Sequence, residues 1–93
     1  MVINKQMGMT RGDFDRLIPL ALGTEVFEKL PDGVRLGDAQ RSLTITLGPE
    51  GKRKIALLEL PSTPVTITFK GYTEEEAEAA LAEFDRAFQR GGG

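Results

Sequence analysis

The sequence contains no cysteine, no histidine and no tryptophan. The absence of cysteine excludes disulfide bonds, zinc–thiolate sites and thiol catalysis. Without histidine, the chain lacks the usual general base near neutral pH and the commonest metal ligand. The two serines, Ser42 and Ser62, lie outside any Gly-x-Ser-x-Gly pattern. We therefore expect no enzyme, and no catalytic, cofactor-binding or metal-binding residues.

Long apolar runs are missing as well. No stretch approaches the ~20 residues needed to span a bilayer, and the N-terminus lacks the apolar segment of a secretory signal. The formal net charge of -2 makes a nucleic-acid partner unlikely, because such binding depends on many cationic side chains. These features predict a cytoplasmic protein without a membrane partner, and its small size favours a bacterial origin.

The length of 93 residues, with 40% apolar content, predicts a single α+β domain over residues 1–93. Residues 1–8 show no clear period, so we expect a flexible lead-in, although Val2 and Ile3 could add a short edge contact. Residues 91–93 are all glycine and predict a flexible tail.

The stretch from Ser42 to Tyr72 has the apolar–polar alternation of strands. Three segments predict strands: 43–47, 54–60 and 65–69. Two segments rich in glycine and proline predict the turns between them: 48–52 and 61–64. The outer strands each have one apolar face, whereas the middle strand has apolar side chains on both faces. We therefore expect an antiparallel meander with 54–60 at its centre.

The apolar rows of the outer strands set the register of this meander. Ile45 is expected opposite Ile55, and Leu57 is expected between Leu43 and Ile67. This register leaves three apolar residues of the middle strand on the far face: Ala56, Leu58 and Leu60. They are the candidate interface, because helices covering one face of so small a sheet would leave the other exposed.

Two helices flank the strands. Thr10 and Asp13 form an acidic capping box, and an apolar stripe predicts a helix that ends by Gly23: Phe14, Leu17, Ile18 and Ala21. Thr73 and Glu76 form a second capping box before a helix that ends at Gly91. Its apolar face comprises five residues: Ala77, Ala80, Leu81, Phe84 and Phe88.

The segment between the first helix and the meander is the hardest to interpret. Residues 24–30 predict a strand, Pro31-Asp32-Gly33 predicts a turn, and residues 34–36 predict a short return strand. The sequence therefore leaves undecided whether residues 24–36 form one strand or two. The chain as a whole predicts a two-layer α+β sandwich with a four- to five-stranded antiparallel meander and both helices on one face, in the order α-β-β-β-β-α or α-β-β-β-β-β-α.

Several charged clusters are candidate sites. Four glutamates lie near the start of the second helix: Glu74, Glu75, Glu76 and Glu78. Because they point to different faces of the helix, they favour a solvated first turn over a metal site. Three cations lie at the tip of the first glycine-rich turn and form a candidate basic docking tip: Lys52, Arg53 and Lys54. This tip would suit an acidic partner or a phosphate. Arg11-Gly12-Asp13 matches the integrin-binding tripeptide, but it falls in a first helical turn and is interpreted as coincidence.

The C-terminal pair Gly92 and Gly93 resembles the end of the ubiquitin-like sulfur carriers. The resemblance implies a carboxylate that is adenylated and then thiolated by an activating enzyme. In that family the tail follows a strand, whereas here it follows a predicted helix.

Three hypotheses follow from these observations. The first is a small non-catalytic protein-interaction domain that self-associates as a homodimer or acts as an accessory subunit through the second face of its sheet. The second is a carrier modified or recognised at Gly92 and Gly93. The third is a small-ligand-binding module, with its site between the helices and the sheet.

Overall fold

The computed structural model describes residues 1–91, and within them the chain forms six strands and two helices. The strands are β1 (Val2–Met7), β2 (Glu28–Leu30), β3 (Gly33–Gly37), β4 (Ser42–Leu47), β5 (Gly51–Ile55) and β6 (Leu58–Lys70). The helices are α1 (Arg11–Leu22) and α2 (Glu74–Gly91).

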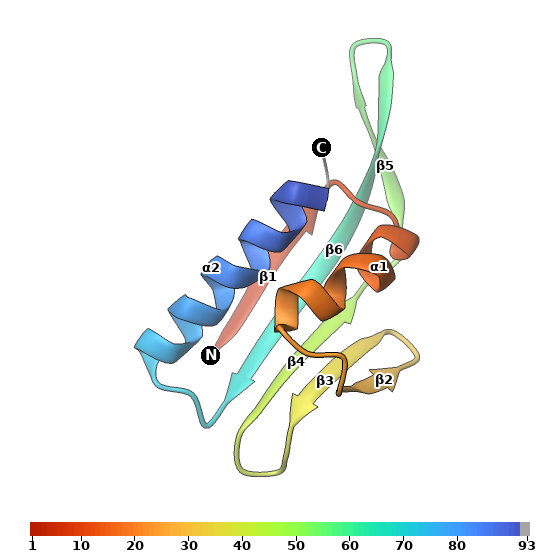
Figure 1. Cartoon of the computed structure of the whole chain (residues 1–93). Coiled ribbons are helices and arrows are strands. Elements are labelled where there is room, and N and C mark those ends of the chain that lie inside the picture. Colours follow the sequence, from red (N-terminus) through yellow and green to blue (C-terminus); the bar gives the residue numbers. More distant parts are fainter. Residues whose placement is uncertain (92–93) are drawn as a thin grey trace.

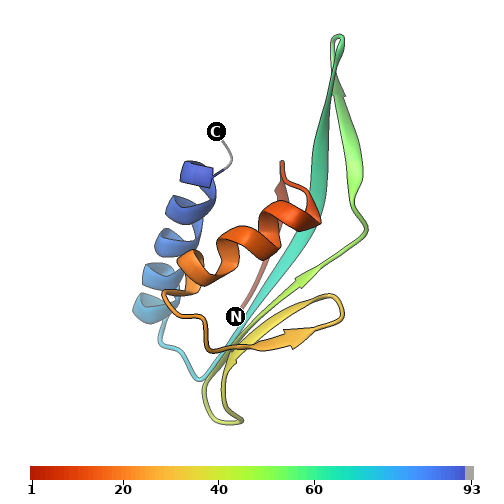
Figure 2. The same cartoon turned by 45° about the vertical axis from the view of Figure 1, so that its right-hand side comes forward.

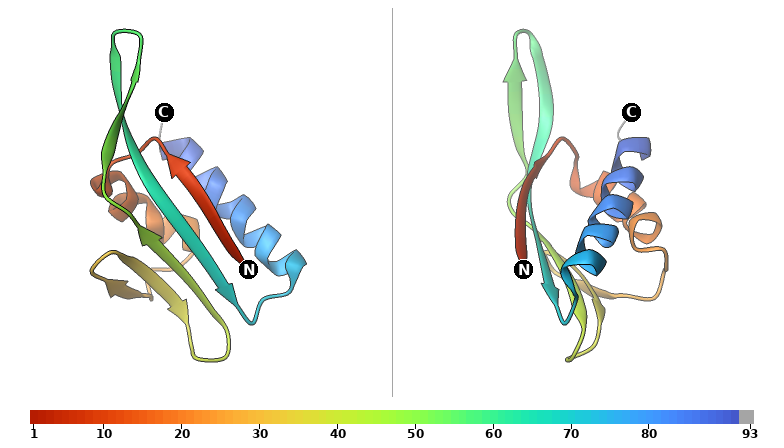
Figure 3. Two further views of the ribbon diagram at one scale, coloured as in Figure 1. Left: turned by 180° about the vertical axis from the view of Figure 1, so that it is seen from behind. Right: turned by 90° about the vertical axis from the view of Figure 1, so that its left-hand side faces the viewer.

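The strands form one open antiparallel sheet with the helices on a single face. The order across the sheet is β1-β6-β4-β3-β2, and β5 pairs with the first part of β6 (Figure 1). The edge-on view in Figure 3 shows α1 and α2 together on the same side of the sheet. The α+β sandwich predicted from the sequence is therefore confirmed.

Both helices begin at the capping boxes that the sequence predicts. The Thr10 hydroxyl accepts a hydrogen bond from the Asp13 amide, and the Asp13 carboxylate accepts one from the Thr10 amide. Thr73 and Glu76 make the same reciprocal pair at the start of α2. Gly23 ends α1 in the left-handed conformation, which glycine adopts at little steric cost.

The core lies between the helices and the sheet. The predicted apolar stripe of α1 is buried, and Phe14 stacks on Phe88 of α2 with 6.1 Å between ring centroids. Below them lie the inward-facing residues of β4 and β6, including Ile45 and Ile67, which are cross-strand partners. The apolar alternation of these two strands therefore faces the helices, as predicted.

The expectation of a flexible lead-in over residues 1–8 is wrong. Residues 2–7 form β1, an edge strand that pairs with β6 along its whole length. Ile3, Lys5 and Met7 point toward the helices, and the Lys5 ammonium lies 3.0 Å from the Asp85 carboxylate of α2. A lysine in the middle of the inward row broke the apolar alternation, and so the sequence pattern concealed the strand.

The placement of residues 54–60 as the central strand of the predicted meander is also wrong. Ile45 pairs with Ile67 rather than Ile55, because β4 and β6 are direct neighbours. Residues 54–60 do not lie between them. They form the far end of one long hairpin, with β4 and β5 along one side and β6 along the other, and the chain turns at Ala56 and Leu57.

The two predicted turns lie opposite each other in this hairpin. Leu47 pairs with Val65 and Gly51 with Ser62, so three residues, 48–50, face two residues, 63–64. One extra residue on one strand is a β-bulge, which bends the ribbon and increases its twist. The glycine and proline residues in both segments therefore mark one bend, not two reversals.

The prolines of β6 fit this arrangement. Pro61 lies opposite Lys52 in the two-stranded part, where every second N–H faces solvent and a proline removes no ladder hydrogen bond. Pro64 lies at the bulge, where its carbonyl accepts a hydrogen bond from the Gly48 amide at 2.8 Å. A continuous strand can therefore pass through both positions.

The sheet face opposite the helices is polar instead of apolar. Thr44 pairs with Thr68 and Thr46 with Thr66, and these four threonines are half-buried. The sequence predicts a second apolar face of the sheet at Ala56, Leu58 and Leu60. This prediction is wrong, because these residues lie beyond the body of the sheet.

Residues 24–36 form two short strands. β2 and β3 pair as a hairpin with Glu28 opposite Arg35, and the turn falls at Pro31 and Asp32, as the sequence indicates. The expected strand over 24–30 is shortened to its last three residues.

Candidate functional site

The outer part of the long hairpin projects beyond the rest of the molecule. Residues 51–60, called here the docking arm, are exposed at every position. Figures 1 and 2 show the arm extending past the helices and the body of the sheet. The largest dimension of the chain is accordingly 46 Å, against 26 and 21 Å in the other two directions.

The arm forms by regular strand pairing closed by a two-residue turn. Ile55 pairs with Leu58, Lys54 with Glu59 and Arg53 with Leu60. The turn residue Ala56 has a φ of 55°, a left-handed conformation that is unfavourable for a side chain other than glycine. A two-stranded ribbon of this kind is marginally stable on its own in water.

Cross-strand partners share a face, so the pairing gives the arm two different surfaces. One face carries Lys52, Lys54 and Glu59, and each ammonium lies 3.7 Å from the Glu59 carboxylate. The opposite face carries Ile55, Leu58 and Leu60, with Arg53 beside Leu60. The arm is therefore amphipathic, with a charged side and an apolar side.

The apolar side chains of the arm are unusually exposed. Leu57 at the turn is 101% exposed and Leu58 is 64% exposed. Ile55 and Leu60 are exposed as well. Fully burying a leucine is worth about 1.5–3 kcal/mol. At four neighbouring positions of the docking arm, the folded chain does not gain this free energy of burial.

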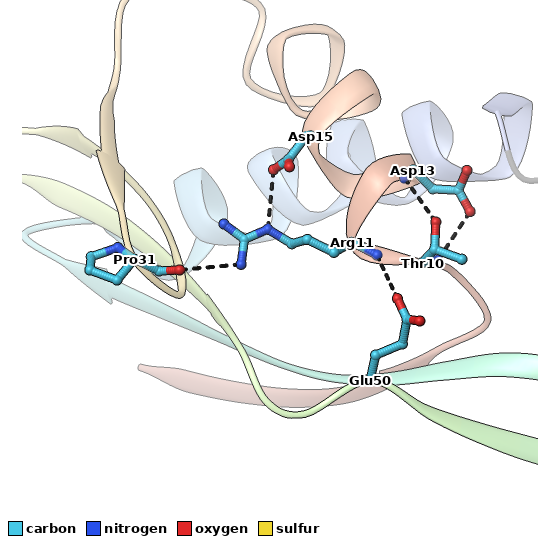
Figure 4. A network of polar contacts seen from close by, with 6 residues as sticks. All are labelled: Thr10, Arg11, Asp13, Asp15, Pro31 and Glu50. Atoms are coloured by element: carbon cyan, nitrogen blue, oxygen red, sulfur yellow. Dashed lines mark hydrogen bonds and ion pairs between the residues drawn. The ribbon is translucent and has the colours of Figure 1, made fainter.

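The base of the arm is fixed to the body by three hydrogen bonds. The Glu50 carboxylate accepts from the Arg11 amide at 2.8 Å, at the start of α1 (Figure 4). Buried Thr63 donates through its hydroxyl to the Met9 carbonyl at 2.7 Å, and the Gln6 amide donates to the Ser62 hydroxyl at 2.6 Å. The end of β1, the β1–α1 connection and the start of α1 therefore hold both strands of the arm where they leave the body.

Arg11 extends this junction toward the β2–β3 turn. Its guanidinium lies 3.2 Å from the Asp15 carboxylate and 3.4 Å from the Pro31 carbonyl (Figure 4). Arg11 thus links the first turn of α1 to two loops. The tripeptide Arg11-Gly12-Asp13 is part of this helix start and its capping box.

A hollow of about 290 Å³ opens between the end of α1, the first half of α2 and the sheet. This apolar groove is lined by side chains from all three layers, including Leu20, Leu36, Leu81 and Phe84. Leu20 is 57% exposed at its edge. The helices therefore leave part of the inner sheet face open here.

Charged side chains line the apolar groove beside the apolar ones. Arg41 lies 2.7 Å from the Glu76 carboxylate and stacks over the Tyr72 ring at 4.1 Å from its centroid. The Thr73 amide and then the Arg41 guanidinium lower the pKa of Glu76 to about 2. Glu83 adds a second carboxylate. Both carboxylates are ion-paired, Glu76 with Arg41 and Glu83 with Arg86 at 2.6 Å.

The predicted site residues fall into three groups. Leu58 and Leu60 lie on the apolar face of the arm and Ala56 in its turn, while Lys52, Arg53 and Lys54 lie along β5 of the same arm. The predicted interface and the predicted basic tip are thus brought together on one element. Gly92 and Gly93 lie outside the described residues.

Sequence reasoning missed Ile55 and Leu57 as members of this surface. Both were assigned to the core-facing side of a middle strand. Apolar residues on either side of a two-residue reversal would have indicated an exposed tip, but Ala-Leu carries none of the usual turn signals.

Other predicted clusters do not converge in the described part of the chain. In residues 1–91, no three acidic side chains are grouped as a metal site would require. Ser42 is buried in β4, and Ser62 accepts the hydrogen bond from Gln6. Over the same range no helix is long and apolar enough to cross a membrane.

The fold and the arm together define a two-layer α+β protein with an amphipathic, projecting hairpin. Comparison with known proteins found no match to a family model, to a curated protein or to a solved structure.

Proposed function

We propose that this chain is a protein-docking module that binds a partner protein through the docking arm. The observation that carries the proposal is the gathering of four exposed apolar side chains on an element that contributes nothing to the core: Ile55, Leu57, Leu58 and Leu60. Exposed apolar surface of this kind is typical of interaction sites.

The charge of the arm indicates the chemistry of the partner. Residues 51–60 carry three cations and one carboxylate, a net charge of +2, which leaves -4 for the rest of the chain. Opposite charges around an interface steer association and suppress wrong partners. The proposed partner surface is therefore an apolar groove with carboxylates around it.

Burial of the exposed leucines would contribute favourably to the free energy of a complex. Burying two of the leucines supplies on the order of 3–6 kcal/mol. Anchoring at its base reduces the conformational freedom that the ribbon has to lose on binding, which lowers the entropic cost. The three hydrogen bonds at residues 50, 62 and 63 supply this anchoring.

Site-specific photo-crosslinking in cells tests the proposal. A photoreactive amino acid replaces Leu57 in one variant and Val26 in a matched control, since Val26 is 82% exposed and lies outside the arm. We expect one dominant crosslinked product from position 57, lost when Leu58→Glu is added. Equal products from both positions, or no product from position 57, would contradict the proposal.

The carrier and small-ligand hypotheses have less support. The carrier tail, Gly92 and Gly93, lies outside the described residues. A small ligand would use the apolar groove, where Arg41 and Glu76 bind each other and so offer little polar recognition.

A further inference from the structure

The chain itself carries a surface of the kind that the docking arm requires. The apolar groove between α1, α2 and the sheet is about 290 Å³ in volume, near the small end of the ~300–1,000 Å³ typical of ligand pockets. Its lining is mostly leucine, isoleucine and phenylalanine. A narrow apolar projection is a suitable occupant for such a hollow.

The helix that forms one wall of the groove begins with exposed carboxylates, which are opposite in sign to the charge of the arm. Glu76 and Glu83 line the groove and are paired with Arg41 and Arg86. The α2 wall also begins with exposed Glu74 and Glu75, so this end of the molecule is acidic. The arm, at +2, would meet negative charge here, whereas two arms packed against each other would bring like charges together.

We infer that the docking arm of one copy inserts Leu57 and Leu58 into the apolar groove of a second copy. This inference rests on the proposed function and names its partner. The arm projects from one end of the molecule, and the end of α1 and the start of α2, which line the groove, lie away from that end (Figure 1). The contact is therefore heterologous, and each pair keeps one free arm and one free groove.

A head-to-tail contact makes a specific prediction about mass. The average mass of the assemblies that the native chain forms is expected to rise with concentration and to exceed the mass of a dimer, because every added copy exposes a new arm. An arm–arm contact, in contrast, closes on itself and stops at two copies. Sedimentation equilibrium from about 10 μM to about 1 mM covers the range of weak association.

Complementation between two variants isolates the contact. Leu57→Glu with Leu58→Glu disables the arm, and Leu20→Glu places a charge at the exposed edge of the groove. Each variant alone is expected to associate at least about tenfold more weakly than the native chain. Mixed together, they are expected to form a 1:1 pair and nothing larger, because each supplies the one working surface that the other lacks.

The controls keep the outcomes separate. Val26→Glu adds the same charge at an exposed apolar site elsewhere and is expected to associate like the native chain. Circular dichroism verifies that each variant is folded, and Leu81→Arg replaces Leu20→Glu if the latter is not. A native chain that stays monomeric to about 1 mM, or a Leu20→Glu variant that associates normally, overturns this inference. A crosslink from position 57 to a different protein would then leave the proposed function standing.

Discussion

At the scale of single residues, Gly48 is the position where the bulge tolerates least change. A Cβ atom added there would lie 2.7 Å from the Pro64 ring, well inside van der Waals contact. We expect Gly48→Ala to lower the free energy of unfolding by about 1–3 kcal/mol, the usual cost of overpacking. Urea denaturation measures it.

Gly51→Ala is the matched control for this prediction. Gly51 lies at the other end of the same bulge, and a Cβ there would meet its nearest atom, the Ser62 carbonyl, at an ordinary 3.7 Å. Its expected effect is within about 0.5 kcal/mol. Equal losses in both variants would show that the Gly48–Pro64 approach is unimportant.

Glu76 is the residue that links stability to pH. Its pKa is about 2 in the folded chain, below the ordinary 4.5, because the Thr73 amide and Arg41 stabilise the carboxylate. A lowered pKa contributes stability that is complete above about pH 4.5 and is lost as the pH falls toward 2. Glu76→Gln should therefore reduce the loss of stability between about pH 6 and about pH 2.5.

Urea denaturation at both pH values gives this comparison. Glu75→Gln removes the same charge one position away, from a side chain outside the capping box. We expect this control to keep the native pH dependence. A Glu76→Gln variant whose stability falls with acid as steeply as that of the native chain would refute the assignment.

At the scale of elements, the junction between the arm and the body depends on Thr63. Its hydroxyl is buried and donates to the carbonyl of buried Met9. Thr63→Val keeps the shape but leaves that carbonyl without this donor, which costs about 1–3 kcal/mol. Thr66→Val, which removes a hydroxyl from the more exposed contact with Asn4, should cost less than about 1 kcal/mol in the same urea experiment.

The elements that sequence reasoning predicted well are those with complete local signals. Thr10 with Asp13 and Thr73 with Glu76 place both helix starts, because a capping box needs no information from the rest of the chain. The alternation in β4 and β6 likewise identifies the buried face. These signals together were sufficient for the α+β sandwich.

The elements that were predicted wrongly depend on contacts distant in sequence. Lys5 lies on the inward face of β1 because it pairs with Asp85, and this distant partner cannot be identified from the local sequence. The glycine and proline residues at 48–50 and 61–64 signal a break in each strand, but a bulge and a turn share this composition. The candidate residues Leu58 and Leu60 were found for their unpaired apolar character, while their place on an arm depended on the position of the true turn.

At the scale of the whole molecule, the arm accounts for the elongated shape. The radius of gyration of the chain is 13.5 Å, whereas a compact chain of this length is expected near ~12 Å. The body holds the core cluster, and residues 51–60 contribute none of it. The arm should therefore be separable from the fold.

Removing the arm tests this separation. Residues 52–61 are replaced by Asn-Gly, which joins the paired residues Gly51 and Ser62 through a favourable two-residue turn. We expect small-angle scattering at low concentration to give a radius of gyration smaller by about 1 Å, and urea denaturation to give a stability within about 1 kcal/mol of the native value. An arm-deleted chain that is unfolded would mean that the exposed leucines serve the fold. A folded chain of near-native stability would show that the exposed leucines are dispensable for the fold.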